Sequence, residues 1–288
     1  MTQVGKSNRG RALVLLFAGT LLAGCGVTPP QLHPTSPVPP PPSVATTAPA
    51  GPTTAPAPAT TPPAPVTPTP SNTPTTTPTT EPLSNDKVDC RKVKCVALTF
   101  DDGPGPYTIE LLSYLEEAQV PATFFMLGER VAASPKVVQA VADAGHQIGV
   151  HTWDHRRLIL MDAAHVRTEI TSTIRIIKRV TGARPRLMRP PYGETNSTVA
   201  AQARRAKVAQ ILWDVDTLDW KTLSTKKTIK AAVNQAKRGS IVLMHDIHPT
   251  TVAAVPGIIK GLRKKGYTFV TVGQLLGKTK PGLIYSHA

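Results

Sequence analysis

The decapeptide CVALTFDDGP, residues 95–104, is an apolar run that ends in two carboxylates and a turn. An apolar run of this length bounded by turn residues predicts a buried strand. Gly103 and Pro104 turn the chain away, which leaves Asp101 and Asp102 at the carboxyl end of the strand. Because neighbouring side chains leave a strand in different directions, one carboxylate can bind a metal ion while the other acts on a water.

The chain beyond this strand repeats the pattern of short apolar runs separated by helical periodicity. Further strands are predicted at Ala122–Met126, Gln147–Val150, Ala209–Trp213, Ile241–Met244 and Thr268–Val270. Helices are predicted at Pro135–Ala144, Thr168–Val180 and Lys226–Ala236. This alternation indicates an α/β fold of parallel units with functional groups at the carboxyl ends of the strands. Phe100, Val150 and Met244 are each followed directly by Asp or His, which fits that arrangement.

Two histidines follow the strand that ends at Val150. His151 and His155 are four residues apart, a spacing that lets both imidazoles face one point from a helical turn. Such a pair alone is a weak signal for a metal site. With Asp102 it forms a set of two imidazoles and one carboxylate, which leaves coordination positions open for water and substrate and suits zinc and related divalent ions.

Three later motifs place polar groups in a similar setting. In RPPYG, residues 189–193, the prolines stiffen the loop, Gly193 lets the backbone approach a ligand, and Arg189 can hold a carboxylate through a fork of N–H donors. A structural proline turn with a surface arginine is the alternative. In DTLDW, residues 216–220, a carboxylate lies beside an aromatic wall. His245 follows a predicted strand directly, where an imidazole can donate a proton near neutral pH.

In this order and spacing, the motifs resemble the polysaccharide deacetylase (NodB homology) family, also called carbohydrate esterase family four. The resemblance covers residues 96–272. It rests on TFDD at 99–102, HTWDH at 151–155, RPPYG at 189–193, DTLDW at 216–220 and LMH at 243–245. The fold that the resemblance implies is a distorted (β/α) barrel of the NodB type, often with an incomplete strand count, which agrees with the alternation of predicted strands and helices.

The resemblance also implies metal-dependent removal of acetyl groups from N-acetylated sugars. The residues at the matching metal-binding positions are Asp102, His151 and His155. One divalent ion is expected there, with zinc first and cobalt, nickel or manganese as alternatives. Asp101 would be the general base that deprotonates the attacking water, and Arg189 would orient it. Thr152 would brace the histidine loop.

The resemblance also implies which residues act on the leaving amine, the oxyanion and the acetyl methyl group. His245 would be the general acid that protonates the departing amine, and Asp219 would orient and tune it. The backbone N–H of Tyr192 would stabilise the oxyanion. Trp220 and Leu243 would wall the pocket that receives the acetyl methyl group.

The first 25 residues are typical of an export signal. Three basic residues precede an apolar run at 12–18 that is too short to span a bilayer. The small residues LAGC at 22–25 resemble the bacterial lipoprotein signal, in which the thiol of Cys25 receives a diacylglyceryl group and cleavage follows Gly24. Ordinary secretory cleavage, with Cys25 left as a spare cysteine, is the alternative.

Residues 25–86 are predicted to be a disordered Pro/Thr-rich tether. Of the 30 prolines, 20 lie between positions 29 and 82, and no charged residue lies between 12 and 80. Such a segment buries too little apolar surface to fold, and its proline runs favour extended polyproline II. The expected organisation is a signal peptide at 1–24, this tether, and a catalytic domain at 87–288. Two folded domains, a collagen-like fibre and a multi-pass membrane protein are excluded.

The chain is basic, with 33 Lys and Arg against 18 Asp and Glu. Basic residues cluster at 175–186, 204–207 and 260–265. A basic surface can bind nucleic acid, but an exported chain rarely meets it and no nucleic-acid motif is visible, so no such partner is predicted. Attraction to an anionic cell wall and plain solvation of helix faces both stay open. Nothing in the sequence suggests a dimer, and a monomer is expected.

Cys90 and Cys95 are predicted to form a disulfide at the start of the catalytic domain. Disulfides persist outside the membrane, and four intervening residues permit a small closed loop. A pair of metal-binding thiols is the alternative, although no second Cys or His pair nearby would complete such a site.

The substrate is inferred from the expected location at the outer face of the bacterial membrane. A lipid-anchored domain on a long tether meets its own cell wall first, where peptidoglycan is the abundant acetylated polymer. Its N-acetylglucosamine is the expected target and its N-acetylmuramic acid the next. The alternatives are a chitooligosaccharide deacetylase, an acetyl-xylan esterase and, from a different class, a non-catalytic wall-binding lipoprotein.

The lipid anchor is tested by Cys25→Ala. Two acyl chains hold a protein on a bilayer because burying them contributes about 0.8 kcal/mol per methylene. We expect the variant to leave the membrane fraction, measured by fractionation and immunoblotting. A variant that stays in the membrane fraction contradicts the lipoprotein prediction.

Overall fold

The structure is a computed structural model that describes residues 88–288. The signal peptide, Cys25 and the tether lie outside the described residues, so these parts of the predicted organisation stay predictions. Within 88–288, no helix is both long and apolar enough to cross a membrane.

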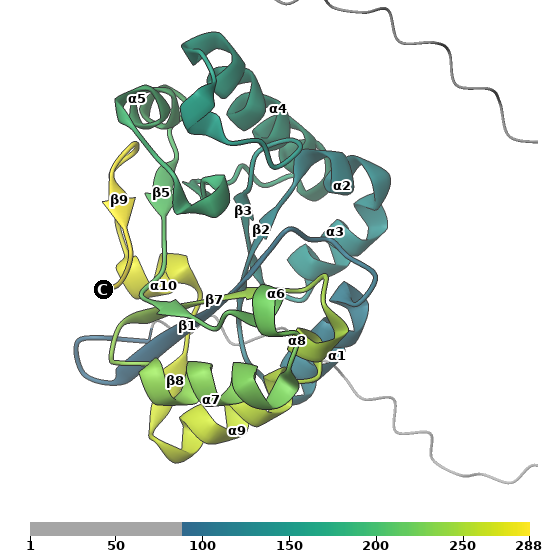
Figure 1. Ribbon diagram of the computed structural model, residues 1–288, viewed down its shortest axis with the longest axis vertical. Coiled ribbons are helices and arrows are strands. Elements are labelled where there is room, and N and C mark those ends of the chain that lie inside the picture. The colour runs from purple at the N-terminus through teal and green to yellow at the C-terminus, as the bar shows by residue number, and fades with distance from the viewer. Residues whose placement is uncertain (1–87) are drawn as a thin grey trace, which may run out of the picture. The chain divides into compact units, whose positions relative to one another are not determined.

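Strands and helices alternate along most of the described chain (Figure 1). The strands are β1 Lys94–Asp101, β2 Thr123–Met126, β3 Gln147–Val150, β4 Leu187–Met188, β5 Ala209–Ile211, β6 Val215–Asp216, β7 Ser240–His245, β8 Tyr267–Phe269 and β9 Ile284–Tyr285. The helices are α1 Thr108–Glu117, α2 Gly128–Ala133, α3 Pro135–Asp143, α4 Ala163–Thr181, α5 Ser197–Arg205, α6 Asp219–Thr222, α7 Thr225–Gln235, α8 Pro249–Val252, α9 Val255–Lys264 and α10 Val272–Leu276. Two short 3₁₀ turns, η1 Leu158–Leu160 and η2 Pro191–Gly193, complete the elements.

The strands form one curled sheet in the order β6-β7-β1-β2-β3-β4-β5-β9, with β8 paired to the start of β1. Every pairing between these strands is parallel. The sheet curls with helices around it (Figure 1). An isolated antiparallel bridge joins Ser240 to His287. The predicted distorted (β/α) barrel is confirmed.

The central strand β1 separates two apolar cores by simple alternation. Val96, Leu98 and Phe100 belong to the larger core between the sheet and the helices. Cys95 and Ala97 belong to a smaller core on the other face of the sheet. Since side chains alternate along a strand, the odd-numbered row continues from Ala97 to Thr99 and Asp101, both of which are buried. The larger core therefore holds β1 in place. The odd-numbered side chains on the other face of β1, which we call its inner row, carry the polar groups.

Parallel register lines up the polar ends of neighbouring strands. Asp101 at the end of β1 lies beside His245 at the end of β7. Val150 of β3 lies beside Met188 of β4, so the residues that follow them, His151 and Arg189, emerge at the same rim. Sheet pairing thus brings most of the motifs together, although they lie up to 144 positions apart in the sequence.

The disulfide Cys90–Cys95 closes the loop that enters β1, as predicted. The carbonyl of Cys90 accepts a hydrogen bond of 2.8 Å from the Arg238 guanidinium, which ties this loop to the chain just before β7. The disulfide lies at the start of β1, at the opposite end of the strand from Asp101.

The structure differs from the predicted elements mainly where the chain turns. The predicted strand at 209–213 ends at Ile211. The chain then leaves β5, and the N–H of Asp214 donates to the carbonyl of Ile241 in β7. Helix α4 begins at Ala163, earlier than the predicted Thr168, because Asp162 caps it by accepting from two backbone N–H groups.

Candidate active site

The carboxyl ends of the strands surround a cavity of about 400 Å³. It is lined by Asp101, Asp102, His151, His155, Pro190, Tyr192, Trp213, Asp216, Trp220, Leu243 and His245. The cavity therefore brings together residues from all five motifs, and they form one site at the rim where the sequence placed them.

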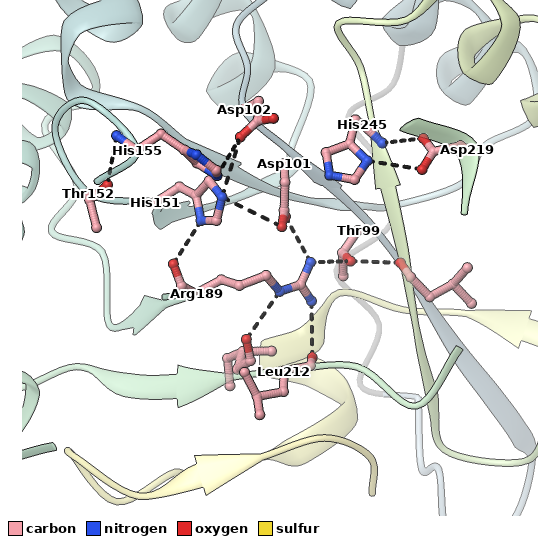
Figure 2. A network of polar contacts seen from close by, with 12 residues as sticks. Thr99, Asp101, Asp102, His151, Thr152, His155, Arg189, Leu212, Asp219 and His245 are labelled. Atoms are coloured by element: carbon pink, nitrogen blue, oxygen red, sulfur yellow. Dashed lines mark hydrogen bonds and ion pairs between the residues drawn. The ribbon is translucent and has the colours of Figure 1, made fainter. Parts of the chain in front are cut away.

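Asp102, His151 and His155 lie within reach of a single cation. The Nε2 atoms of both histidines are 3.4 Å from Oδ1 of Asp102 (Figure 2). One ligand atom from each of the three residues lies within 4.8 Å of the other two. Distances of this size suit three ligands that share an ion of about 2 Å bond length.

The local backbone that aims these side chains is not helical. Asp102, Thr152 and His155 all have positive φ, of 70°, 69° and 65°. The predicted helical turn across His151 and His155 is therefore wrong. A loop with two left-handed residues turns both imidazoles to the same point, and Thr152 Oγ1 accepts a 3.1 Å hydrogen bond from the His155 N–H. Strained backbone of this kind clusters at functional sites.

The donor set fits a divalent transition metal. Oδ1 of Asp102 is buried and has no hydrogen-bond partner among the described residues. An unpaired buried carboxylate oxygen is costly, and a cation between it and the two imidazoles would satisfy it. His151 Nδ1 contacts the carbonyl of Arg189 at 2.7 Å, which leaves its Nε2 directed at Asp102.

The two imidazoles differ in their electrostatic surroundings. Burial lowers the pKa of His155, and the neighbouring His151 lowers it further, so its neutral form is favoured. Burial also acts to lower the pKa of His151, but the charges of Asp101 and Asp102 outweigh it and the net shift is upward. Neutral imidazole is the form that binds metals, so the lowered pKa of His155 favours metal binding and the raised pKa of His151 opposes it.

Asp101 faces the cavity from the inner row of β1 and contacts Arg189. The guanidinium of Arg189 is fully buried, and its Nη1 donates to Asp101 Oδ1 and to Thr99 Oγ1, each at 2.8 Å. Its Nε and Nη2 donate to the carbonyls of Ile211 and Leu212, both at 3.1 Å (Figure 2).

The structure thus places Arg189 in the interior, which excludes a surface arginine on a proline turn. The expected fork of donors to one carboxylate is wrong, because a single nitrogen reaches Asp101 and the others bind backbone carbonyls. The guanidinium also stacks on aromatic rings, 4.3 Å from the centroid of Phe125 and 5.5 Å from that of Trp213.

His245 lies across the cavity from the histidine pair and is held by Asp219. Its Nδ1 is 2.9 Å from Asp219 Oδ1, and its backbone N–H donates to Asp219 Oδ2 at 2.8 Å. Thr251 also donates to Oδ2. Burial acts to lower the pKa of His245, but the hydrogen bond and charge of Asp219, with Asp101 and Asp102, raise it to about 9. At neutral pH the charged form of His245 is therefore favoured, and the residue lines the cavity.

Apolar and aromatic side chains form the walls of the cavity. Tyr192 and Trp220 are 59% and 50% exposed, so their rings are open to an incoming molecule. Tyr192 has a φ of 60°, and its ring packs edge-on against His155 with centroids 4.7 Å apart. Leu243 is buried at the end of β7.

Sequence reasoning missed several residues at this site. Trp213 lines the cavity, although its predicted place was inside a strand. Thr99 completes the contacts of Arg189, and Asp246 is fully buried beside the loop of Asp102. The sequence signal for Asp246 was its position, because it is an ionisable residue directly after His245. His248 lies with its ring centroid 6.1 Å from that of His245.

Comparison with known proteins gives one consistent result. A family model described as polysaccharide deacetylase matches residues 89–211. The peptidoglycan-N-acetylmuramic acid deacetylase PdaC of Bacillus subtilis is 40% identical over 63% of this chain and 38% of its own length. A peptidoglycan-N-acetylglucosamine deacetylase of Bacillus cereus is 38% identical over 61% of this chain and 68% of its own. The chain thus spans about two fifths of the B. subtilis relative and two thirds of the B. cereus one.

A solved structure agrees with the sequence comparisons. The structure described as T48 deacetylase with substrate superposes with a TM-score of 0.67 and 46% identity, and covers 69% of this chain and all of that chain. Similarity at this level extends across the catalytic fold.

The pKa of His245 is tested by NMR titration of its imidazole in the chelator-treated protein. We expect a pKa of about 9 in the wild type and a value nearer the ordinary 6.5 in Asp219→Asn, because the buried carboxylate is what favours the charged imidazole. A raised histidine pKa stabilises the fold below pH about 6.5, and this stabilisation is lost as pH rises through about 9. The variant should therefore be less stable than the wild type at pH 6, with the difference shrinking towards pH 10.

Thr251→Val is the matched control, because it removes one donor to Asp219 but keeps the charge. An unchanged His245 titration in Asp219→Asn would contradict the electrostatic origin of the shift.

Proposed function

Because the chain belongs to the polysaccharide deacetylase family, we propose that it hydrolyses the N-acetyl groups of amino sugars in cell-wall peptidoglycan and releases acetate. The enzyme class, a hydrolase acting on carbon–nitrogen bonds, follows from family membership. The observation that carries the proposal is the cavity in which Asp101, the Asp102–His151–His155 set and His245 converge. The names of the relatives support peptidoglycan as the polymer.

The family is metal-dependent, and Asp102, His151 and His155 would hold the ion. A divalent cation there supplies a Lewis acid that increases the acidity of water and polarises a carbonyl. Zinc is proposed because two imidazoles and one carboxylate are a donor set that it favours.

Asp101 acts as the general base and takes the proton of the water that attacks the acetamide carbon. Its position favours this role, because it lies on the inner row of β1 with one oxygen held by Arg189. The other oxygen, Oδ2, is 3.8 Å from His151 Nε2, so it faces the proposed metal position. Arg189 is a positioning residue, since its guanidinium holds Asp101 and its backbone carbonyl contacts Nδ1 of His151.

His245 acts as the general acid and donates its Nε2 proton to the departing amine. An amine is a poor leaving group unless it is protonated, and the raised pKa of His245 keeps that proton available at neutral pH. Asp219 fixes the ring through Nδ1, which leaves Nε2 for the substrate. The neighbouring β1 and β7 thus supply the base and the acid from register-paired positions.

The backbone N–H of Tyr192 is proposed to stabilise the oxyanion, because the left-handed turn at this residue lies at the cavity wall. Trp220 and Leu243 form the apolar surface for the acetyl methyl group. The exposed faces of Tyr192 and Trp220 at the rim suit sugar rings of a longer glycan.

The location is proposed from the sequence alone. A diacylglyceryl group on Cys25 and the tether at 25–86 would place the catalytic domain at the outer face of a bacterial membrane, within reach of the wall. A monomer is sufficient for the proposed chemistry, because residues of one chain supply every group named above.

The base and metal assignments are separated by two variants. Asp101→Asn should keep metal affinity but lose turnover by a factor of about 10² to 10⁴, the usual contribution of a general base. His151→Ala should lose both, with metal affinity falling more than about 100-fold because a direct ligand is removed. Metal affinity is measured by competition with a chromophoric chelator, and turnover by acetate release.

His165→Ala is the control for the histidine substitution, since His165 is an exposed residue of α4 paired with Asp162. Near-normal turnover in Asp101→Asn would remove the base assignment. Unchanged metal affinity in His151→Ala would remove the metal site.

The substrate is tested by measuring acetate release from purified peptidoglycan, chitooligosaccharide and acetylated xylan in parallel, with added zinc or cobalt. We expect release from peptidoglycan. When the free amines of the product are labelled with fluorodinitrobenzene before acid hydrolysis, labelled glucosamine should exceed labelled muramic acid. Release from xylan alone indicates an esterase, and release from chitooligosaccharide alone indicates a chitin-type enzyme. Glycan binding without acetate release would favour a non-catalytic wall-binding protein.

A further inference from the structure

Helices α7 and α9 carry an unusual excess of positive charge. From Trp220 to Ala288 the sequence contains twelve Lys and Arg but a single acidic residue, Asp246, which is fully buried. No acidic group of this segment therefore reaches the surface to offset the positive charges. The catalytic chemistry uses none of the exposed lysines.

Helices α7 and α9 pack closely, with glycines of α9 facing side chains of α7. A Cβ built on Gly257 would lie 2.6 Å from the Ile229 side chain, and one on Gly261 would lie 2.7 Å from Val233. The absence of side chains at these two glycines lets α9 press against α7. The helices lie side by side below the sheet in Figure 1.

Five lysines lie on the solvent side of this pair. Lys226, Lys227 and Lys230 are exposed on α7, opposite its buried positions Thr228 and Ala232. Lys260 and Lys264 are likewise exposed on α9. We call these five residues the α7–α9 lysine face.

None of the five lysines forms an ion pair with another described residue, although Glu117 of α1 lines the same surface pocket as Lys260. The ion pairs among residues 88–288 involve other positions. Two nearby cations are engaged elsewhere, because Lys265 donates to the carbonyl of Val233 and Arg263 to that of Ala118. The lysine face also adjoins the cleft, since α6 carries Trp220 at the cavity wall and Lys221 next to it, and leads directly into α7.

We propose that the α7–α9 lysine face binds a linear phosphate-bearing polymer and so holds the cleft against a surface that contains such polymers. Lysine ammonium groups act as point charges that suit phosphate, whereas planar carboxylate recognition favours arginine. A membrane surface is disfavoured, because α7 and α9, both fully described, expose no large apolar side chain that would enter a bilayer.

The test compares two variants of equal charge loss. The face variant replaces the five lysines with glutamine: Lys226→Gln, Lys227→Gln, Lys230→Gln, Lys260→Gln and Lys264→Gln. The control variant removes five exposed cations from α4 and α5: Arg175→Gln, Lys178→Gln, Arg179→Gln, Arg204→Gln and Arg205→Gln. Binding to linear inorganic polyphosphate is measured at several salt concentrations, with hyaluronan, neutral dextran and anionic phospholipid vesicles as further probes.

We expect the wild type to bind polyphosphate with an affinity that falls steeply with salt, and the face variant to lose about tenfold or more. The control variant should lose much less. Equal losses in both variants would show that net charge alone acts and would overturn the proposal, as would stronger binding to hyaluronan or to vesicles than to polyphosphate. Polyphosphate binding is measured without turnover, so its outcome does not depend on the proposed function.

A second inference concerns the buried pair Asp246 and Thr108, which lies beside the loop that follows Asp102. The side chain of Asp246 is fully buried, and its Oδ2 accepts a 2.5 Å hydrogen bond from Thr108 Oγ1. Thr108 Oγ1 in turn accepts from the N–H of Gly105 at 2.7 Å. A Cβ on Gly103 would lie 2.6 Å from both carboxylate oxygens of Asp246. Asp246 thus occupies the space left by Gly103 and is tied to the loop on both sides of Pro104.

This contact bears directly on Asp102, the residue before Gly103. Asp102 adopts a left-handed φ of 70°, which a side-chain-bearing residue holds only when its surroundings enforce it. We infer that Asp246 and Thr108 are positioning residues that hold the turn through which Asp102 is presented to the metal. This inference rests on the proposed metal site.

The test is zinc affinity, measured by chelator competition, in Thr108→Val. Thr228→Val is the matched control, because Thr228 is equally buried and its hydroxyl also donates a hydrogen bond, to the carbonyl of Ser224, but it lies on α7. Both variants should lose thermal stability, but zinc affinity should fall about tenfold in Thr108→Val alone, as for other groups that orient metal ligands. Thr108→Ser should restore the affinity.

Equal zinc affinity in Thr108→Val and Thr228→Val would overturn the inference while leaving the metal site intact. A wild type that binds no zinc would instead contradict the proposed function. If Thr108→Val fails to fold, Asp246→Asn provides the same comparison, and wild-type affinity there overturns the inference.

Discussion

The buried contact between Arg189 and Asp101 organises the interior of the barrel. A guanidinium with no solvent exposure is tolerated only when its charge is paired and its N–H groups are bonded. Here one carboxylate, one hydroxyl and two backbone carbonyls meet that demand, and they come from β1 and from the end of β5. The aromatic rings of Phe125 and Trp213 enclose the cation. The strands must therefore converge on this side chain, and the catalytic rim forms directly above it.

Two structural features place the site residues, and we describe them as the first and second device. Parallel register decides which residues reach the rim together, as with Asp101 beside His245. Left-handed turns decide where the next side chain points, as at Asp102, Thr152 and Tyr192. The first device is stabilised by apolar burial in the larger core. The second is strained, and hydrogen bonds such as that from the His155 N–H to Thr152 offset the strain.

The sequence predicted what depends on burial and period, and little of what depends on tertiary contact. The strand that leads into Asp101 and the parallel barrel followed from apolar runs, and the motifs of the resemblance contain every residue that lines the cavity except Trp213. The two-residue strands β4, β6 and β9 have no detectable period, so they were missed. The pair His151 and His155 has helical spacing but loop conformation, because left-handed residues reproduce the same convergence. The single-nitrogen contact of Arg189 depends on carbonyls that no local pattern reveals.

Asp101 and His245 each have a buried partner of opposite charge. Arg189 supplies a positive partner to Asp101, whereas Asp219 supplies a negative partner to His245. Arg189 fixes one oxygen of Asp101 in place, and the charge of Asp219 favours the charged form of His245. Burial of both partners strengthens the effect, because Arg189 and Asp219 are shielded from solvent. The roles proposed for Asp101 and His245 therefore depend on Arg189 and Asp219, two residues that do not line the cavity.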